Sequence, residues 1–433
     1  MRYERNFYEI CPLIYSMEVV VIGGGIVGLS SAYFLQEAGH QVTIIDQSDM
    51  TNNCSYGNWG YVCPSHFVPL ATPGIVKQGF KWMLNSESPF YVKPRLSLSL
   101  IKWGLQFMKE ATAEKVERAA IPLRDYSLFS KKLYADWESL PQFNFAYEHK
   151  GLLEIFQTEK AGEHAKHLMH KAHELGLTDT KLLNQQELFA MEPNHQINAI
   201  GAIHFGCDGH LYPNKLMQQL IAHLKNKGVV IKTNEAVVDF EKTAGKIIAV
   251  ITSTNKYKAD AVVLATGSWS REMAKKLDMD LLLMPGRGYS VTIENTPYQT
   301  IYPSVLVEGR VALTPIEGNK MRFGGTMEIT STNEPPNLKR VAGILKAVKS
   351  YYPSFEIPVP TIDKVWYGYR PCSADGLPYL GRTKKWNNLV MATGHAMVGL
   401  SLGAGTGKLV SEIIDEKPTS IDISFYNPER FNH

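Results

Sequence analysis

The sequence predicts an α/β protein in which a domain with a parallel sheet is interleaved with a second, α+β domain. Three observations lead to this prediction. An apolar run, a glycine-rich turn and a helical pattern follow one another near residue 20. Two more strand-to-glycine elements appear much later, near residues 265 and 393. The segments between these elements differ in character, because one is rich in helical patterns and the other in strand patterns.

The first element occupies residues 17–46, MEVVVIGGGIVGLSSAYFLQEAGHQVTIID. Residues 19–22 are continuously apolar, as in a parallel strand that is buried on both faces. Apolar positions with helical spacing predict a helix over 26–38, and a glycine follows it. A second strand over 41–45 ends at Asp46. Strand, glycines, helix, strand and acid in this order are typical of a Rossmann-type dinucleotide-binding unit.

Each part of this unit has a chemical role. Gly23 allows the tight turn, Gly25 lets the pyrophosphate approach the backbone, and Gly28 lets the helix pack closely on the strand. The helix N-terminus adds partial positive charge for the phosphates. Asp46 can accept a hydrogen bond from a ribose 2′-hydroxyl and would repel a 2′-phosphate, which argues against NADP. The predicted cofactor contacts of the turn are Ile22, Gly23, Gly24, Gly25, Ile26, Val27 and Gly28.

The later elements indicate FAD rather than NAD. Residues 209–228 predict a helix that begins near Pro213, and short strands follow it up to the turn Ala265-Thr266-Gly267-Ser268. Residues 387–414 repeat the pattern, with a strand, a glycine-rich turn and a helix that begins near Gly399. Three separated elements of this kind indicate one nucleotide-binding domain that is interrupted twice. FAD is long enough for this layout, with its AMP part at the first turn and its flavin near the last helix.

The chain has 433 residues, which is enough for two domains with substantial cores. The FAD-binding domain is expected to be discontinuous, over residues 17–90, 210–275 and 362–416. The substrate-binding domain is expected over residues 91–209, which are largely helical in pattern, and 276–361, which are β-rich. In the latter, the expected strands include RGYSVTI, RVALTPI and MRFGGTM. Residues 1–16 are either a non-native extension before Met17 or a short ordered arm.

Composition narrows the class of protein. A content of 44% hydrophobic and 20% charged residues is that of a soluble globular protein. The net charge is +3 and no basic block stands out, so we expect no nucleic-acid partner. No apolar run approaches the roughly 20 residues of a membrane-spanning helix. The five cysteines show neither a CxxC pair nor zinc-like spacing, so we expect reduced thiols in the cytoplasm and no metal site.

One arginine, Arg370, lies among aromatic residues and glycines in VWYGYRPCSADGLPYLGR, residues 365–382. A guanidinium in such surroundings needs an anionic partner. Its planar fork matches a carboxylate through two parallel hydrogen bonds, which a lysine does not reproduce. The partner is either the carboxylate of a substrate or a structural acid such as Asp375.

Seven segments, in order, resemble the D-amino acid dehydrogenases, within the wider glycine oxidase and D-amino acid oxidase superfamily of flavoproteins. They are IGGGIVGLSSAYFLQEAGHQVTIID, GNWGYVCPS, PLATPGIVKQGFKWML, ATGSWS, PGRGYSVTI, GYRPCSADGLPYLGR and NNLVMATGHAMVGLSLGAGTGKLVSEI. The resemblance implies non-covalent FAD and amino acid catabolism. The implied reaction is oxidative deamination of a D-amino acid to a 2-oxo acid and ammonia, by hydride transfer to flavin N5. The implied electron acceptor is a quinone of the respiratory chain or another acceptor, instead of oxygen.

The resemblance also implies roles for individual residues. Arg370 matches the arginine that clamps the substrate carboxylate in glycine oxidase-like enzymes. Asn58 and Gly60 match a segment close to the isoalloxazine. His395 is the candidate polar group near flavin or substrate, or else a hydrogen-bonded structural residue, and Tyr289 either faces the substrate or belongs to the core. The remaining predicted cofactor contacts are Val237, Thr266, Gly267, Gly394 and Gly399. Cys372 is interpreted as an ordinary thiol, not as a covalent flavin link.

Two departures from the dehydrogenase pattern concern the substrate. Cys63-Pro64-Ser65 and then His66 stand where Ser-Pro-Gly and an aromatic residue are common. Ala396 replaces a frequent glycine. Both segments are expected to line the flavin or the substrate. Alternative functions are therefore a D-hydroxyproline (cyclic imino acid) dehydrogenase, a glycine or sarcosine oxidase that uses oxygen, and a flavoprotein without turnover.

Residues 75–109 mix Lys and Arg with Trp82, Trp103 and many leucines. Such a mixture fits a membrane surface, where a quinone could accept electrons. The alternative is the packing of helices around a substrate site, with lysines on the solvated face, which the second domain needs in any case. The protein is accordingly expected in the cytoplasm, or bound peripherally to the inner face of the cytoplasmic membrane.

Overall fold

The computed structural model describes residues 16–74, 88–93, 95 and 97–431. Its first elements are β1 (Glu18–Ile22), α1 (Ile26–Glu37) and β2 (Gln41–Ile45), as the sequence predicts. The apolar run of β1 is buried because strands lie on both sides of it and helices and strands cover both faces. The predicted extension and part of the predicted membrane-facing stretch lie outside the described residues.

A six-stranded sheet collects strands from three distant parts of the chain, in the order β19-β20-β13-β1-β2-β9. All pairs are parallel except β19–β20. The additional strands are β9 (Val230–Lys232), β13 (Ala261–Leu264), β19 (Tyr379–Arg382) and β20 (Leu389–Thr393). The parallel part brings the carboxyl ends of β1, β2, β13 and β20 to one edge, where ligands bind in open α/β sheets.

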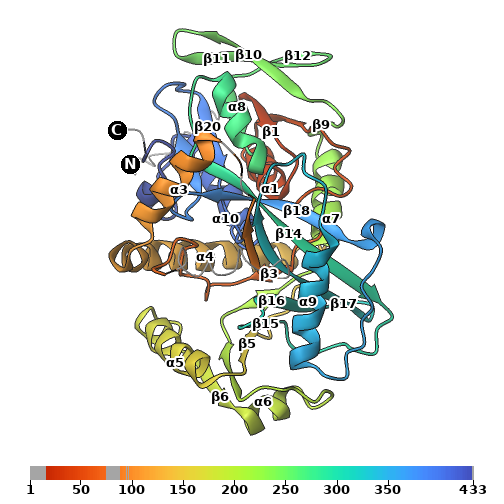
Figure 1. The fold of residues 1–433 in the computed structure, drawn as a ribbon. Coiled ribbons are helices and arrows are strands. Elements are labelled where there is room, and N and C mark those ends of the chain that lie inside the picture. Colours follow the sequence, from red (N-terminus) through yellow and green to blue (C-terminus); the bar gives the residue numbers. More distant parts are fainter. Residues whose placement is uncertain (1–15, 75–87, 94, 96, 432–433) are drawn as a thin grey trace, which may run out of the picture.

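Helices and a small sheet cover the two faces of this sheet (Figure 1). On one face, α1 packs between α7 (Pro213–Asn226) and α10 (Gly403–Ile414). On the other face lies an antiparallel sheet of β10 (Val237–Thr243), β11 (Lys246–Thr252) and β12 (Lys256–Lys258), together with α8 (Ser270–Lys276). The helix expected near Gly399 begins only at Gly403, because residues 399–402 form turns.

A second sheet has nine strands, in the order β18-β14-β17-β16-β15-β5-β7-β6, with β4 paired to β17. Its members are β4 (Phe90–Val92), β5 (Leu152–Phe156), β6 (Thr180–Asn184), β7 (Gly201–Phe205), β14 (Leu283–Glu294), β15 (Ser304–Leu306), β16 (Val311–Ile316), β17 (Lys320–Ile329) and β18 (Trp366–Ser373). The β-rich character of 276–361 is confirmed. The helical segment before it also contributes three strands.

Five helices surround this second sheet. They are α3 (Leu98–Glu110), α4 (Ala113–Glu138), α5 (Glu159–Glu174), α6 (Gln185–Met191) and α9 (Leu338–Tyr351). The apolar face of α9 covers β16 and β17, while α4 reaches back to α10 and so links the two halves. The limits of the two domains stay predictions, and β18, which carries Arg370, pairs with β14 of the nine-stranded sheet.

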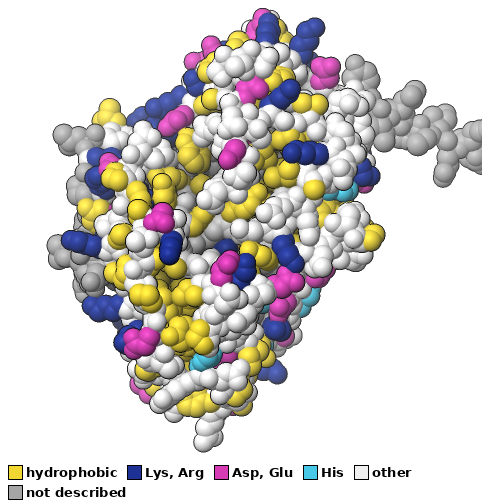
Figure 2. All heavy atoms as spheres, turned by 90° about the vertical axis from the view of Figure 1, so that its right-hand side faces the viewer, with side chains coloured by type: hydrophobic (Ala, Val, Ile, Leu, Met, Phe, Trp, Pro, Cys, Tyr) yellow, Lys and Arg dark blue, Asp and Glu magenta, His cyan; other side chains and the backbone are white. Residues whose placement is uncertain are grey.

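Charged side chains of both signs lie on one face of the molecule. On the face that carries α7 and α9, Lys and Arg side chains are interspersed with Asp and Glu (Figure 2). Within the described ranges, no helix is both long enough and apolar enough to cross a bilayer.

Candidate active site

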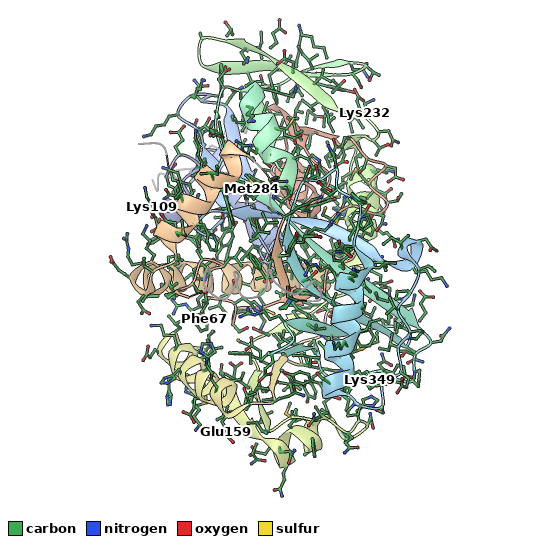
Figure 3. All side chains as sticks on the ribbon, viewed as in Figure 1. Phe67, Lys109, Glu159, Lys232, Met284 and Lys349 are labelled. Atoms are coloured by element: carbon green, nitrogen blue, oxygen red, sulfur yellow. The ribbon has the colours of Figure 1, made fainter. Side chains whose placement is uncertain are left out.

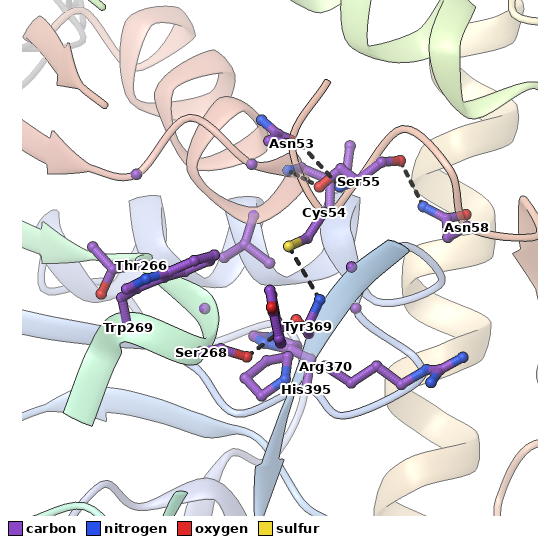
Figure 4. A pocket seen from close by; sticks show the side chains of 18 of the residues that line it. Asn53, Cys54, Ser55, Asn58, Thr266, Ser268, Trp269, Tyr369, Arg370 and His395 are labelled. Atoms are coloured by element: carbon purple, nitrogen blue, oxygen red, sulfur yellow. Dashed lines mark hydrogen bonds between the residues drawn. The ribbon is translucent and has the colours of Figure 1, made fainter. Parts of the chain in front are cut away.

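A cavity of about 570 Å³ opens at the carboxyl ends of the parallel strands and extends to β14 and β18. Its volume is in the range of cofactor and small-molecule sites. Figure 4 shows Tyr369, Arg370 and His395 on one side of it and the loop with Asn53 to Asn58 on the other. Each sheet therefore supplies part of the lining, which is the usual situation of a site between two domains.

The glycine-rich turn forms one end of this cavity. Gly23 has a φ of +107°, and a Cβ there would lie 2.5 Å from the carbonyl oxygen of Ala265. A Cβ on Gly28 would lie 1.8 Å from the carbonyl oxygen of Gly23, so the close approach of helix and turn requires glycine. Gly25 is the N-cap of α1 and has no side chain, while the hydroxyl oxygen of Ser55 accepts a hydrogen bond from the N–H of Ile26 at 3.0 Å. The other backbone N–H groups at the start of α1 lie at this end of the cavity, as an anion site requires.

Asp46 lies at the cavity edge, directly after β2. Its Oδ2 accepts a hydrogen bond from the backbone N–H of Gly24 at 2.6 Å. Its Oδ1 accepts hydrogen bonds from the N–H and the hydroxyl of Ser48, at 2.7 and 2.6 Å. These bonds fix the carboxylate against the turn, and Oδ2, which accepts only one of them, keeps acceptor capacity for a ribose hydroxyl. Turn, helix N-terminus and carboxylate together fit an adenine dinucleotide.

Most of the predicted site residues line the cavity. They are Ile22, Gly23, Gly25, Ile26, Val27, Asp46, Asn58, Val237, Thr266, Gly267, Tyr289, Arg370, His395 and Gly399. Four predicted glycines lie behind this lining: Gly24, Gly28, Gly60 and Gly394. A Cβ on Gly60 would lie 2.0 Å from the carbonyl oxygen of Leu211, and one on Gly394 would lie 2.7 Å from the ring of Tyr379. Their geometry favours a packing role, and their contact with the cofactor stays a prediction.

Arg370 is partly buried on β18 and points into the cavity (Figure 4). Its Nη1 donates a hydrogen bond to the carbonyl oxygen of Thr326 at 2.7 Å, and its guanidinium lies 5.3 Å from the ring centroid of Trp59. A Cβ on Gly288 would lie 2.1 Å from Nη1, so glycine there makes room for the guanidinium. Burial lowers the pKa of Arg370 from its ordinary value, and the group stays cationic near neutral pH.

The proposed structural partner of Arg370 was wrong. Asp375 instead accepts two hydrogen bonds from Arg430, from Nε at 2.6 Å and from Nη2 at 2.9 Å. Among the described residues, no Asp or Glu forms an ion pair with Arg370. Within the part of the chain that is described, the partners of the Arg370 guanidinium are therefore the carbonyl oxygen of Thr326 and the ring of Trp59, and neither carries a negative charge.

A second arginine on the neighbouring strand is fully paired. Arg287 donates from Nε and Nη2 to Oε2 of Glu328, at 3.0 and 2.8 Å. Tyr289 donates its hydroxyl to the same oxygen at 3.0 Å and accepts a hydrogen bond from the N–H of Asn337 at 2.9 Å. Burial raises the pKa of Tyr289, so the phenol stays protonated. The ring of Tyr289 lines the cavity, but its hydroxyl belongs to this buried network.

His395 is buried beside β18. It pairs with Cys372 as an isolated bridge, and its Nε2 lies 3.0 Å from the hydroxyl oxygen of Thr406. Burial lowers the pKa of His395 to about 3, so the imidazole is neutral at physiological pH. The next residue, Ala396, lines the cavity with a φ of +45°, a left-handed conformation that disfavours a side chain. Its replacement of a frequent glycine thus has a structural cost.

Cys63 and His66 do not line the cavity, contrary to expectation. The strand before them, β3 (Tyr61–Val62), pairs with β8 (Gly209–His210) and leads the chain toward Asp208. Cys372 also lies outside the lining, and burial raises the pKa of its thiol to about 12, as an unreactive thiol requires.

Six aromatic residues of the lining were not anticipated: Trp59, Tyr61, Trp269, Trp366, Tyr367 and Tyr369. The ring of Trp366 lies flat over two glycines, since a Cβ on Gly57 or on Gly368 would come within 2.3 Å of it. Alternation along β18 places positions 366, 368 and 370 on one face, which was the available signal for Trp366 but not for Tyr367 or Tyr369. Trp59 had no such signal, because it reaches Arg370 from another part of the chain.

Comparison with known proteins agrees with this geometry. A family model described as "FAD dependent oxidoreductase" (DAO) matches residues 18–413. D-amino acid dehydrogenase of Helicobacter pylori J99 is 32% identical over 400 residues, which is 92% of this chain and 94% of that protein. D-amino acid dehydrogenase of a Neisseria meningitidis serogroup C strain is 30% identical over 411 residues, 94% and 97% of the two chains.

Solved structures confirm the predicted fold. Glycine oxidase from Geobacillus kaustophilus has a TM-score of 0.76 at 20% identity and covers 96% of this chain and 99% of its own. L-proline dehydrogenase from P. horikoshii has a TM-score of 0.69 at 19% identity, with 96% and 98% coverage. The matched span, the FAD-compatible cavity and the shared fold lead to one conclusion: the chain belongs to the DAO family of FAD-dependent oxidoreductases and is an enzyme that uses FAD.

Proposed function

We propose that the protein catalyses the oxidative deamination of a D-amino acid to a 2-oxo acid and ammonia. The observation that carries this proposal is the cation of Arg370, which faces the cavity without an acidic partner among the described residues. A buried charge is stable only when it is paired and hydrogen-bonded. The carboxylate of an amino acid would complete the pairing. The similarity to D-amino acid dehydrogenases supports the choice of the D-isomer.

Arg370 would bind the substrate carboxylate through its guanidinium fork. The bond from Nη1 to Thr326 fixes the plane of the guanidinium, and the face of Trp59 limits its movement. Each charge-assisted hydrogen bond contributes about 1.5–3 kcal/mol. Because two such bonds define an orientation, they also position the substrate α-carbon within the cavity.

The cofactor would be held at the opposite end. We assign the pyrophosphate to the N–H groups at the start of α1, around Gly25, and the adenosine ribose to Asp46. When bound, FAD supplies the acceptor for the hydride of the substrate α-carbon. Asn58, Thr266 and Gly399 are the proposed contacts nearer the substrate.

His395 would provide a neutral hydrogen-bonding group in a fixed position beside the substrate. It is bonded to Thr406 and its pKa is about 3, so it is not protonated at the pH of the cell. We therefore expect the substrate amine to react in its neutral form, without a side-chain base.

The test is anaerobic mixing of the purified holoenzyme with a panel of amino acids, followed by the flavin absorbance. The proposal expects bleaching by D-amino acids and none by their L-enantiomers. Bleaching by D-hydroxyproline alone would identify the cyclic imino acid dehydrogenase, and bleaching by glycine or sarcosine with peroxide formed in air would identify the oxidase. A flavin that none of these compounds reduces would contradict catalysis on amino acids.

For the electron acceptor, we propose a quinone that is reached at a membrane surface. Helix α3 supports this proposal. Its residues Leu98, Ile101, Leu105 and Met108 follow helical spacing and are 49% to 79% exposed. Trp103 and Phe107 are the buried residues of α3 and belong to a core that includes Met284, which Figure 3 labels beside this helix. Lys109 at the end of α3 adds positive charge near this apolar stripe, as in peripheral membrane helices.

Vesicle flotation tests the membrane contact. We expect wild type to float with vesicles of anionic lipid and to reduce an added quinone, and Ile101→Glu to lose flotation. The matched control is Ile248→Glu on β11, an isoleucine of similar exposure outside α3. Equal flotation of the two variants, or no flotation of wild type, would contradict the contact through α3.

A further inference from the structure

Outside the cavity, three side chains with metal-binding atoms meet between distant parts of the chain. They are Cys63, His66 and Asp208, and their ligand atoms all lie within 4.8 Å of one another. Cys63 and His66 follow β3, whereas Asp208 lies in the turn between β7 and β8. Phe67, which follows His66, locates the cluster beside the apolar layer between α4 and α5 (Figure 3).

The backbone holds the three side chains in place. The pairing of β3 with β8 sets the two turns side by side, with Val62 opposite Gly209. Within the first turn, the N–H of His66 donates to the carbonyl oxygen of Cys63 at 3.1 Å. Ser65 ties the turns together, because its N–H and its hydroxyl donate to the two carboxylate oxygens of Asp208, at 3.0 and 2.5 Å. The donor atoms are therefore preorganised and not merely near one another.

The carboxylate of Asp208 has no Lys or Arg partner among the described residues, and the basic group that faces it is the imidazole of His66, another member of the cluster. The side chain of Asp208 is completely buried, and across residues 97–431 and the other described ranges no Lys or Arg forms an ion pair with it. The ammonium of Lys131, the nearby cation, donates to the backbone carbonyl of Cys207 instead. Buried carboxylates are as a rule paired with a cation or coordinate a metal. Serine and thiol donors satisfy hydrogen bonds of this carboxylate but leave its charge uncompensated.

We infer that Cys63, His66 and Asp208 bind a Zn²⁺ ion. A thiolate, an imidazole and a carboxylate are the three ligand types of zinc in proteins, and tetrahedral sites with sulfur and nitrogen donors favour zinc over harder cations. Cys207, whose Sγ lies 3.4 Å from Oδ1 of Asp208, borders the fourth position. Binding replaces the thiol proton of Cys63, which passes to the solvent, and forms the Zn–S bond without any redox change.

The proposed zinc site is separate from the cavity in which we propose amino acid oxidation. None of its ligands lines the cavity. The ion would link the turn after β3 to the β7–β8 turn, which are about 140 residues apart in the sequence and are otherwise joined by short strands. Since the ligands come together only in the folded chain, binding of the ion would stabilise that chain. His66 is partly exposed and provides the access path from solvent.

Metal analysis of the purified FAD-bound protein, expressed with added zinc, tests the inference. We expect one zinc ion per chain after dialysis, and a cobalt-substituted form with thiolate-to-Co²⁺ charge-transfer absorption. In Cys63→Ser, His66→Phe and Asp208→Asn, zinc affinity should fall at least about 100-fold, because even hydrogen-bond partners of metal ligands account for about 10–100-fold. Cys372→Ser, a buried cysteine outside the cluster, is the matched control and should retain the ion.

Thermal unfolding provides an independent readout. A chelator should lower the unfolding temperature of wild type and of Cys372→Ser but not that of His66→Phe. Flavin content identifies a variant that has failed to fold. His66→Phe replaces the most exposed of the three ligands, so it tests zinc binding even if Cys63→Ser does not fold. Absence of stoichiometric zinc and of the cobalt charge-transfer band in wild type would overturn the inference. So would an equal zinc content in wild type and His66→Phe.

Discussion

Arg287 and Arg370 lie on neighbouring strands, β14 and β18, and their surroundings differ in one respect. Arg287 is buried against Glu328, which accepts two of its hydrogen bonds. Arg370 faces the cavity and has a carbonyl and an aromatic ring as partners, with no acid among the described residues. A guanidinium that is satisfied internally stabilises the fold, whereas one that lacks an anion can bind a ligand that brings it.

The largest effect is expected for Arg370→Ala. Loss of two charge-assisted hydrogen bonds removes about 3–6 kcal/mol of binding, since each contributes about 1.5–3 kcal/mol. With about 1.4 kcal/mol per tenfold, kcat/KM for a D-amino acid should fall about 100-fold to 10,000-fold. Arg370→Lys keeps the positive charge but not the planar guanidinium, so its kcat/KM should lie between those of wild type and Arg370→Ala. Steady-state assays with an artificial dye measure this, and unchanged kcat/KM in Arg370→Ala would remove the carboxylate role.

The second effect concerns Arg287, the paired arginine, and is expected in the free energy of unfolding. Glu328→Gln leaves Arg287 as an uncompensated buried charge, and breaking a buried pair costs about 3–5 kcal/mol. Chemical denaturation of the FAD-bound protein measures the free energy of unfolding. The matched control is Glu356→Gln, which breaks the exposed pair with Lys349 and should cost at most about 1 kcal/mol. Equal costs for the two variants would contradict the assigned structural role.

A third effect concerns His395, which is buried and neutral, whereas Arg370 is partly buried and charged. The pKa of His395 falls from 6.5 to about 3 on burial, so between these values the unfolded chain binds a proton that the folded chain does not. Its contribution to the free energy of unfolding is therefore lost as pH falls, by about 1.4 kcal/mol per pH unit. In His395→Gln, unfolding between pH 6 and 4 should depend on pH less steeply than in wild type. Identical slopes would show that His395 is protonated in the folded protein.

The smallest effect is expected for Ala396→Gly. Ala396 has a φ of +45°, where a side chain costs about 1–2 kcal/mol relative to glycine, part of which is offset by the greater freedom of glycine in the unfolded chain. The variant should be about 1 kcal/mol more stable. Equilibrium denaturation measures this, and a loss of stability would mean that the methyl group contributes packing that exceeds the backbone strain.

Helices and strands whose signals come from residues adjacent in the sequence were predictable. The unit from β1 to β2 agrees with its predicted bounds to within one residue, because the strand, turn and helix patterns are local. The fold class and the choice of FAD followed from this unit together with the two later strand-to-glycine elements near residues 265 and 393. The start of α10 was predicted four residues too early, because glycines occur both in the turn before the helix and in its first residues.

Contacts between distant strands were not predictable. Thr326 and Trp59 reach Arg370 from residues 44 and more than 300 positions away, through a strand register that no local pattern specifies. The same holds for Asp375, whose partner Arg430 lies near the C-terminus. The unusual Cys63 and His66 were noticed in the sequence, but their position beside Asp208 depends on the pairing of β3 with β8.

The carboxylate preference of the enzyme tests the central claim most directly. Anaerobic flavin reduction is measured with a D-amino acid and with its amide, which has the same side chain and no negative charge. In wild type, the acid should reduce the flavin at least about 100-fold faster than the amide at subsaturating concentration, and Arg370→Ala should lose this preference. Equal rates for acid and amide in wild type would show that the guanidinium of Arg370 does not bind the substrate.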